Sequence, residues 1–146
     1  MRLLIQRVSS ASVHVNDSLI SQISSGLLIL IGIKKDEDIS IIPNLCTKIG
    51  KLRLFPDANG NDNLNVEESN SSLLVVSQFT LYGSCFSGNK PDFKKAASAE
   101  EAFPIYNLFL DTLKTKVPVP LFSGTFGAHM NVFSTNVGPM TFIIEK

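Results

Sequence analysis

Three polar side chains follow an apolar segment in "VVSQFTLYGS", residues 75–84, where Ser77, Gln78 and Thr80 surround Phe79. Hydroxyl and amide groups at the end of a buried strand can bind a ligand that the rigid strand holds in place. The same groups can instead cap the turn that ends the strand. Spacing alone favours the turn, and a binding pocket is the functional alternative.

A second candidate is the dipeptide Gly138-Pro139, which interrupts the apolar terminal segment "TNVGPMTFIIEK". An ordinary hairpin accounts for this dipeptide. The functional alternative is a cis or otherwise fixed proline that presents backbone carbonyls at a set angle.

The familiar nucleophiles are poorly supported. Cys46 falls in an apolar helical pattern, as a buried core cysteine does. Cys85 lies in a Gly/Ser loop, and a cysteine hydrolase would need His14 or His129 as its partner. Neither "GTFG" nor "SGNK" has the form of a nucleophile elbow. No cluster of metal-ligating residues is evident, so neither a metal nor another cofactor is expected.

Composition indicates one α/β domain over residues 1–146. Hydrophobic residues make up 44% of the chain and charged residues 18%, which is typical of a globular protein. The formal net charge of zero argues against wrapping DNA, and two cysteines cannot form a scaffold of disulfides. The longest apolar run, residues 26–33, is too short to span a membrane. We therefore expect a cytoplasmic protein.

Sequence patterns predict the elements that position these residues. Alternation predicts a strand over residues 8–15, and "NDS" predicts a turn over residues 16–18. The apolar run 26–33 predicts a strand covered on both faces. Residues 73–79 predict another buried strand. The tail from residue 126 alternates and is expected to turn at residues 136–139.

Two helices are predicted. The first carries an apolar stripe and has Ser40 as its expected N-cap, with Pro43 in the first turn. The second begins with a capping box formed by Ser98 and Glu101 and contains Pro104. The two stripes consist of Ile42, Leu45, Cys46 and Ile49, and of Ile105, Leu108, Phe109, Thr112 and Leu113. The predicted fold is a single compact α/β domain, with a mostly antiparallel, barrel-like sheet covered by two helices.

Six segments together resemble the D-aminoacyl-tRNA deacylases, the D-tyrosyl-tRNA(Tyr) deacylase family, end to end and in order. They are "LLIQRVSSASVHV", "GLLILIGI", "KIGKLRLF", "LLVVSQFTLYG", "FGAHM" and "NVGPMT". The resemblance implies a homodimer that hydrolyses the ester between a D-amino acid and the 3′ end of its tRNA, and that also removes mischarged glycine. A catalytically idle protein that binds aminoacyl or RNA ends is the alternative.

The resemblance also implies roles for individual residues. The segment Ser77, Gln78, Phe79 and Thr80 would line the pocket for the terminal adenosine and the aminoacyl group. Gly138-Pro139 of the partner subunit would reach into that pocket and exclude L-amino acids. The remaining expected residues are Asn136 and Thr141 in the same motif, Arg7 in support, and Phe126, Gly127, Ala128 and Met130 lining the pocket.

Chemistry constrains the catalytic roles. Ester hydrolysis needs a water, a site for oxyanion charge and a proton for the leaving oxygen. The oxyanion donors would be backbone N–H groups near Phe79 and Thr80, with Gln78 nearby. Thr80 has no evident base beside it, so we expect it to position the substrate while the ribose 2′-hydroxyl assists. Thr80 as a covalent nucleophile is the minority alternative.

The sequence also departs from the family. Many relatives continue after the "SQFTLY" segment with Ala-Asp and an Arg/Lys-rich loop, whereas this chain has "GSCFSGNKPDF" with Lys90, Lys94 and Lys95 as the nearby cations. Val137 stands where an acidic residue is common. A sister group of deacylases has a different segment in place of "SQFTL", so the segment found here favours the D-specific type. Arg7 lies on a core strand and is expected to bond carbonyls around Gly138-Pro139.

Overall fold

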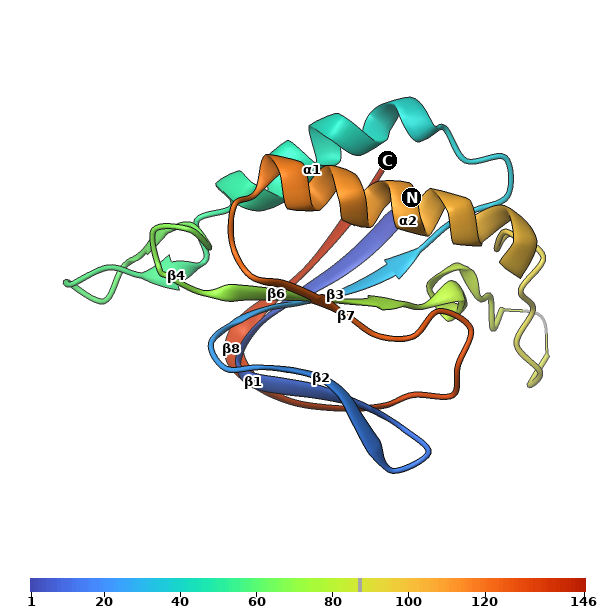
Figure 1. Ribbon diagram of the computed structural model, residues 1–146. Helices are drawn as coiled ribbons and strands as arrows, with labels where there is room; N and C mark the ends of the chain where they lie inside the picture. Colours follow the sequence, from blue (N-terminus) through green and yellow to red (C-terminus); the bar gives the residue numbers. More distant parts are fainter. Residues whose placement is uncertain (87) are drawn as a thin grey trace.

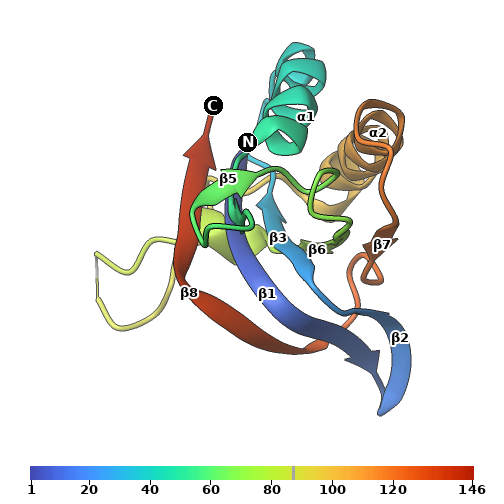
Figure 2. The same cartoon turned by 90° about the vertical axis from the view of Figure 1, so that its left-hand side faces the viewer.

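A curved six-stranded sheet with two helices on one face forms the body of the molecule, seen in the computed structural model in Figure 1. The structure describes residues 1–86 and 88–146. The sheet comprises β1 (Arg2–Val15), β2 (Ser18–Ile23), β3 (Gly26–Gly32), β6 (Ser72–Ser77), β7 (Leu121–Ser123) and β8 (Asn131–Glu145). A separate hairpin joins β4 (Phe55–Pro56) to β5 (Asp62–Leu64). The sheet curls into a nearly closed, barrel-like form (Figure 2), as predicted.

Strand β1 organises the sheet, because it pairs antiparallel with β2, β3 and β8. The pairs β3–β6 and β6–β7 are parallel. Parallel neighbours need a crossover, and the crossovers are helices α1 (Ile42–Lys51) and α2 (Ala99–Lys116). The prediction of a mostly antiparallel sheet is therefore confirmed, with a parallel part that the sequence pattern did not reveal.

Two cores lie on the two faces of the sheet. Leu27, Ile29 and Ile31 of β3 belong to the larger core beneath the helices, and Leu28 belongs to the smaller core on the other face. Residues 73–76 of β6 alternate in the same way. The prediction that residues 26–33 form a strand covered on both faces is confirmed. The rigid part of the sheet is thus the part that leads to the polar cluster.

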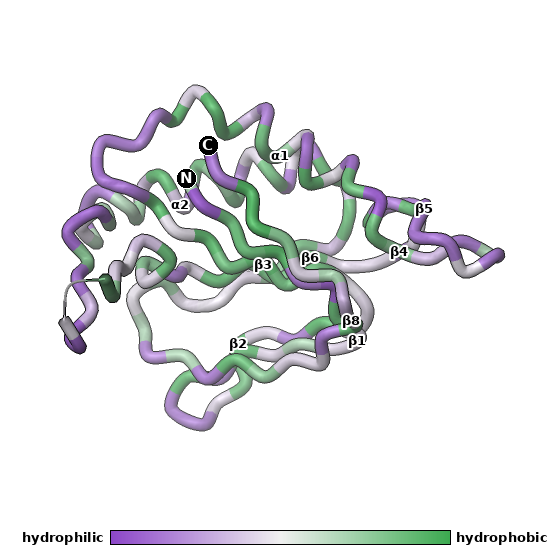
Figure 3. Tube along the Cα trace, turned by 180° about the vertical axis from the view of Figure 1, so that it is seen from behind, coloured by the Kyte–Doolittle hydropathy of each residue, from purple (hydrophilic) through white to green (hydrophobic). Residues whose placement is uncertain are grey.

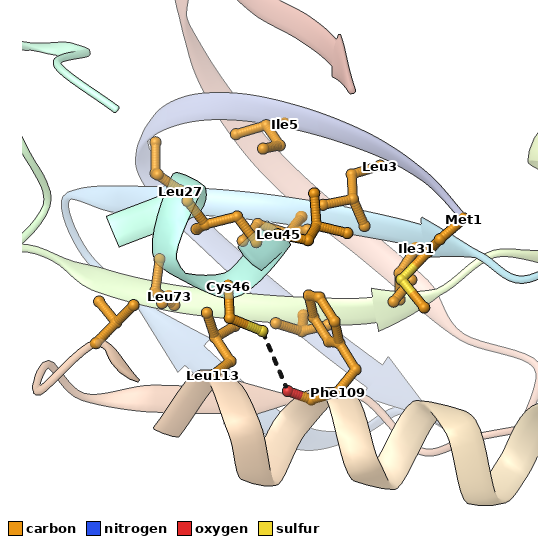
Figure 4. Close-up of a cluster of buried hydrophobic side chains, with 14 of the residues drawn as sticks. Met1, Leu3, Ile5, Leu27, Ile31, Leu45, Cys46, Leu73, Phe109 and Leu113 are labelled. Atoms are coloured by element: carbon orange, nitrogen blue, oxygen red, sulfur yellow. Dashed lines mark hydrogen bonds between the residues drawn. The ribbon is translucent and has the colours of Figure 1, made fainter. Parts of the chain in front are cut away.

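Helix α1 buries the four residues of its predicted stripe, including Cys46, whose thiol faces the carbonyl oxygen of Phe109 at 3.8 Å (Figure 4). Its start differs from the prediction. A short 3₁₀ helix, η1 (Ile39–Ile41), precedes α1, and the capping side chain is Asp38, which accepts from the backbone N–H of Ser40. Ser40 is therefore not the N-cap.

Helix α2 has the predicted capping box between Ser98 and Glu101, and it contains Pro104. The buried face differs from the predicted stripe. It consists of Ala102, Tyr106, Phe109 and Leu113, whereas Leu108 is exposed. The face shifts because α2 packs across both α1 and the sheet, and a single-helix periodicity cannot fix that angle.

Strand β8 contradicts the expected turn at residues 136–139, because it runs along β1 on both sides of the Gly-Pro dipeptide. Gln6 pairs with Thr141 and Val8 pairs with Asn136, so the four residues 137–140 of β8 oppose only Arg7 of β1. The dipeptide lies in a bulge of a continuous strand.

Hydrophobic residues concentrate in the strands, and the tip of the β4–β5 hairpin is hydrophilic (Figure 3). No helix in the described residues is long and apolar enough to cross a membrane.

Candidate active site

The polar cluster lies where β6 ends and turns into η2, a short 3₁₀ helix spanning Phe79–Tyr82. Gln78 occupies the position before η2, and its backbone N–H donates to the Ile31 carbonyl at 2.7 Å. Its side-chain amide donates to the Thr80 hydroxyl. Ser77 is the last residue of β6, paired with Ile31 of β3. The cluster is therefore anchored to the rigid centre of the sheet.

Two residues outside the predicted set position η2. Gly32 lies directly beneath it, since a Cβ at that position would be 3.0 Å from Leu81 Cβ and 3.1 Å from the Gln78 carbonyl oxygen. Arg2 donates to the Leu81 carbonyl, and its guanidinium lies 4.8 Å from the centre of the Tyr82 ring. Burial raises the pKa of the Tyr82 phenol to about 12, so Tyr82 stays neutral beneath the cation.

The start of η2 presents backbone donors. The first hydrogen bond of this helix joins the Leu81 N–H to the Gln78 carbonyl at 3.2 Å. The preceding N–H groups, of Phe79 and Thr80, bond no backbone carbonyl or side chain within the described residues. Both residues are exposed. Two adjacent N–H groups of this kind can bind a developing oxyanion.

Thr80 lies beside these donors without a base. Gln78 is its one side-chain hydrogen-bond partner within the described part of the chain, and an amide cannot remove a proton from a hydroxyl at neutral pH. The arrangement provides positioned donors and acceptors but no activated nucleophile.

The Gly-Pro bulge is the second part of the predicted site. The Gly138-Pro139 peptide bond is cis. The Asn136 side-chain amide spans the bulge, donating to the Arg7 carbonyl at 3.0 Å and to the Met140 carbonyl at 3.3 Å. Beyond the bulge, the Thr141 hydroxyl accepts from the Gln6 side chain at 3.3 Å. Asn136 and Thr141 therefore hold the two ends of the bulge.

Arg7 is buried, but the prediction that its guanidinium bonds carbonyls around Gly138-Pro139 is wrong for this protomer. The guanidinium donates to the Leu54 carbonyl at 2.6 Å and forms an ion pair with Asp62. A buried cation needs a charged or well-oriented partner, and the β4–β5 hairpin provides both. Arg7 supports the bulge through its backbone carbonyl, which accepts from Asn136.

The two parts of the site do not meet within one protomer. Arg2 contacts η2, while Arg7 opposes the Gly-Pro bulge five residues further along β1. Five strand residues span roughly 17 Å. In addition, β8 pairs with the edge of β1 opposite to β3, whereas η2 follows β6 on the β3 side. A ligand at η2 of one protomer is therefore out of reach of that protomer's own Gly-Pro.

The expected pocket-lining residues 126–130 lie between β7 and β8. The Gly124 N–H donates to the Val75 carbonyl at 3.0 Å, which brings the start of this segment beside β6 just before the polar cluster. Phe126 packs against Phe103 and Tyr106 of α2. Gly127 has a φ of +74° in an exposed turn, in which the Ala128 N–H donates to the Thr125 carbonyl at 3.2 Å. Met130 packs on the smaller core.

The cysteine–histidine alternative gains no geometric support. Cys85 lines one cavity with Arg2 and Tyr82, whereas His14 lines a different cavity with Asp17 and Phe133. Burial raises the pKa of the Cys46 thiol to about 12, so this cysteine is unreactive. Ser87, the first residue of the "SGNK" segment, lies outside the described residues.

Sequence reasoning missed Arg2, Gly32 and Asp62. Arg2 is the first residue of β1 and carries no local signal. An isolated glycine at the end of an apolar strand does indicate close approach of another segment. A buried arginine implies a carboxylate partner, but thirteen acidic residues are available in the chain and only the fold selects Asp62.

The chain is similar to known proteins over its whole length. The family model described as "D-Tyr-tRNA(Tyr) deacylase" matches residues 4–145. A D-aminoacyl-tRNA deacylase of Solibacter usitatus is 46% identical over 146 residues, covering 100% of this chain and 96% of the relative. One of Protochlamydia amoebophila is 47% identical with the same coverage. One of Dictyoglomus turgidum is 48% identical over 99% of this chain and 92% of the relative.

Solved structures are similar over the whole chain. A structure titled "c-Myc DNA Unwinding Element Binding Protein" has a TM-score of 0.93 at 38% identity, covering 100% of this chain and 99% of the other. A second, titled as a probable eukaryotic D-amino acid tRNA deacylase, has a TM-score of 0.84 at 17% identity and covers 98% and 97%. The second likeness concerns the fold alone.

Proposed function

The chain belongs to the D-Tyr-tRNA(Tyr) deacylase family and is a hydrolase of the ester bond in D-aminoacyl-tRNA, and from this premise we propose how its site performs and restricts that reaction. The observation that carries the proposal concerns the N–H groups of Phe79 and Thr80, which have no hydrogen-bond partner among the described residues. They lie beside a threonine hydroxyl that has no base among those residues.

The chemical step takes place at η2. Water attacks the ester carbonyl carbon, and the N–H groups of Phe79 and Thr80 bind the oxygen as it becomes negative. The ester C–O bond then breaks, and the leaving ribose oxygen takes a proton. Gln78 and Thr80 position the substrate, while the 2′-hydroxyl of the terminal ribose assists the attack. This assignment is supported by the Thr80 hydroxyl, whose side-chain partner in residues 1–86 and 88–146 is an amide and not a general base.

Chirality is read by Gly138-Pro139 of the partner subunit. Its backbone reaches the aminoacyl group bound at η2 and leaves no room for an L-side chain, so the filter acts by excluding the wrong substrate. Glycine passes because it has no side chain to exclude, and mischarged glycyl-tRNA(Ala) is thus a second substrate. The bulge is suited to this role because Asn136 fixes both of its ends.

A homodimer follows from the separation of the two parts of the site. Strand β8 supports it, since β8 is an edge strand whose residues are almost all exposed. Five of them are large hydrophobic residues, namely Val132, Phe133, Val137, Phe142 and Ile143. An exposed apolar edge of this kind marks an interface.

The first experiment compares D-tyrosyl-tRNA with L-tyrosyl-tRNA and follows loss of the aminoacyl ester. We expect rapid loss of the D-form alone. Loss of both forms would contradict the Gly-Pro filter while leaving the hydrolytic site intact. Loss of neither would favour the alternative, a catalytically idle protein that binds aminoacyl or RNA ends. A cytoplasmic location stays a prediction.

A further inference from the structure

We propose that the cavity next to η2, lined by residues 82–86 with Arg2 and Lys95, binds the single-stranded nucleotides that precede the terminal adenosine of the tRNA. This inference rests on the proposed function, because it concerns nucleotides of the same tRNA substrate that lie beyond the ester and the terminal adenosine.

The cavity has a volume of about 580 Å³ and is lined by Arg2, Tyr82, Gly83, Ser84, Cys85, Phe86 and Lys95. A ligand-binding cavity has a volume of about 300–1,000 Å³, so this one can accept a nucleotide. Its lining begins two residues after Thr80, with no intervening element. Nucleotides that precede one bound at Thr80 can extend over the residues that follow η2, and these residues line the cavity.

Charge in the cavity suits a phosphodiester. Arg2 is partly neutralised, because its Nη2 bonds both carboxylate oxygens of Glu145 at 2.8 and 2.9 Å. Lys95 forms no ion pair with a carboxylate within the described residues, so its full charge is available. Its backbone is fixed, since the Lys95 carbonyl accepts from the Lys35 N–H at 3.0 Å. Lys95 can thus neutralise one phosphate.

The second feature is an exposed aromatic side chain. Phe86 is 100% exposed although it lines the cavity. Cations interleaved with exposed aromatic side chains are typical of sites for single-stranded nucleic acid, in which bases stack on the rings. Phe86 is available to stack on a base, while Lys95 faces the backbone. This pairing favours single-stranded RNA over a small anion or an apolar peptide.

The test compares two substrates that share the ester and the terminal adenosine. D-tyrosyl-tRNA carries the preceding nucleotides, and D-tyrosyl-adenosine does not. Lys95→Ala and Phe86→Ala are each expected to lower the ratio of kcat/KM for the tRNA to kcat/KM for the adenosine ester. For Phe86→Ala, the lost stacking is expected to lower this ratio by about tenfold. The matched control is Lys94→Ala. Lys94 is 90% exposed, pairs with Asp92 at 3.4 Å and does not line the cavity, so the ratio should be unchanged.

A labelled RNA tetramer ending in CCA provides a readout that is independent of catalysis. Its binding to the whole protein is followed by fluorescence anisotropy at several salt concentrations. Lys95→Ala should lower the slope of log Kd against log salt by about 0.7, the value for one phosphate contact on a single strand. An unchanged ratio and an unchanged slope would overturn the inference. If neither ester is hydrolysed, the proposed function fails, and binding of the tetramer alone then decides for or against the cavity.

Discussion

The Thr80 hydroxyl accepts a hydrogen bond from Gln78 and has no base beside it within the described residues. A positioning hydroxyl and a nucleophile differ in what their loss costs. Removing one hydrogen bond costs about 1 kcal/mol, or somewhat less than tenfold in rate. Removing an essential nucleophile costs on the order of a millionfold.

Thr80→Val is therefore expected to slow hydrolysis of D-tyrosyl-tRNA by about tenfold and not to abolish it. A tRNA ending in 2′-deoxyadenosine should be hydrolysed far more slowly by the wild-type protein, because the assisting hydroxyl is missing. Single-turnover rates on both substrates check this. Complete loss of activity in Thr80→Val, with normal unfolding, would favour Thr80 as the covalent nucleophile.

Cys85 is exposed and lines the cavity beside η2, whereas His14 lines a different cavity. Cys85→Ser is expected to change kcat by less than about twofold, since the proposed chemistry uses no thiolate. The substitution tests a thiol mechanism more cleanly than alkylation does, because an alkyl group in the cavity would also obstruct the tRNA. Loss of activity in Cys85→Ser would favour a cysteine hydrolase mechanism.

Gly138 has open space around it within its own protomer, where an added Cβ would meet only Asn136 Oδ1, at 3.9 Å. Gly138→Ala should therefore leave the free energy of unfolding within about 0.5 kcal/mol of the wild type. Activity on D-tyrosyl-tRNA should fall on the order of 100-fold, because the methyl group enters the partner's pocket. Calorimetry and initial rates measure the two effects. Normal activity would show that no substrate approaches this glycine.

At the scale of elements, the position of η2 depends on how closely it lies on β3. Gly32→Ala places a methyl group 3.0–3.2 Å from Leu81, Gln78 and Tyr82, so η2 must move. The expected loss of stability is about 1–3 kcal/mol. We also expect a fall in kcat, because the oxyanion donors shift with η2.

Gly50→Ala is the matched control for this substitution. A Cβ at Gly50 would lie 2.8 Å from Val117 Cγ2, which is equally crowded, but it lies in the helical layer away from η2. The control should lose stability without a change in kcat, as judged by denaturant unfolding and steady-state rates. If Gly32→Ala and Gly50→Ala show the same loss of kcat for the same loss of stability, the fall in kcat does not come from a displacement of η2.

At the scale of the whole molecule, the exposed face of β8 tests the dimer. Ile143 is 65% exposed, so Ile143→Glu leaves the charge solvated in a monomer but buries it in a dimer that uses this face. Light scattering should report a monomer, and activity should fall with the fraction of dimer because each site needs the partner's Gly-Pro.

The control for the dimer prediction is Leu108→Glu. Leu108 is 42% exposed on α2, and its substitution should affect neither mass nor activity. A fully active monomer of Ile143→Glu would contradict a site shared between subunits. If Ile143→Glu stays dimeric, the dimer interface lies on another face of the protein.

Local patterns in the sequence determined much of the secondary structure of this protein and which of its residues are buried. The apolar run 26–33, the stripe on α1 and the capping box at Ser98 each depend on neighbours a few residues apart, and each is confirmed. The order of six motifs likewise identified the family, since the residues that carry a resemblance lie in the chain itself. Those predictions needed no knowledge of long-range contacts.

Tertiary structure alone decided how these segments meet. Arg7 forms an ion pair with Asp62 of a hairpin that is distant in the sequence. Gly138-Pro139 lies in a bulge because β8 pairs with β1 on both sides of the dipeptide. The separation of that bulge from η2 along β1 is likewise a property of strand register. Such contacts join residues far apart in sequence, and their free energy depends on packing and pairing that local periodicity does not encode.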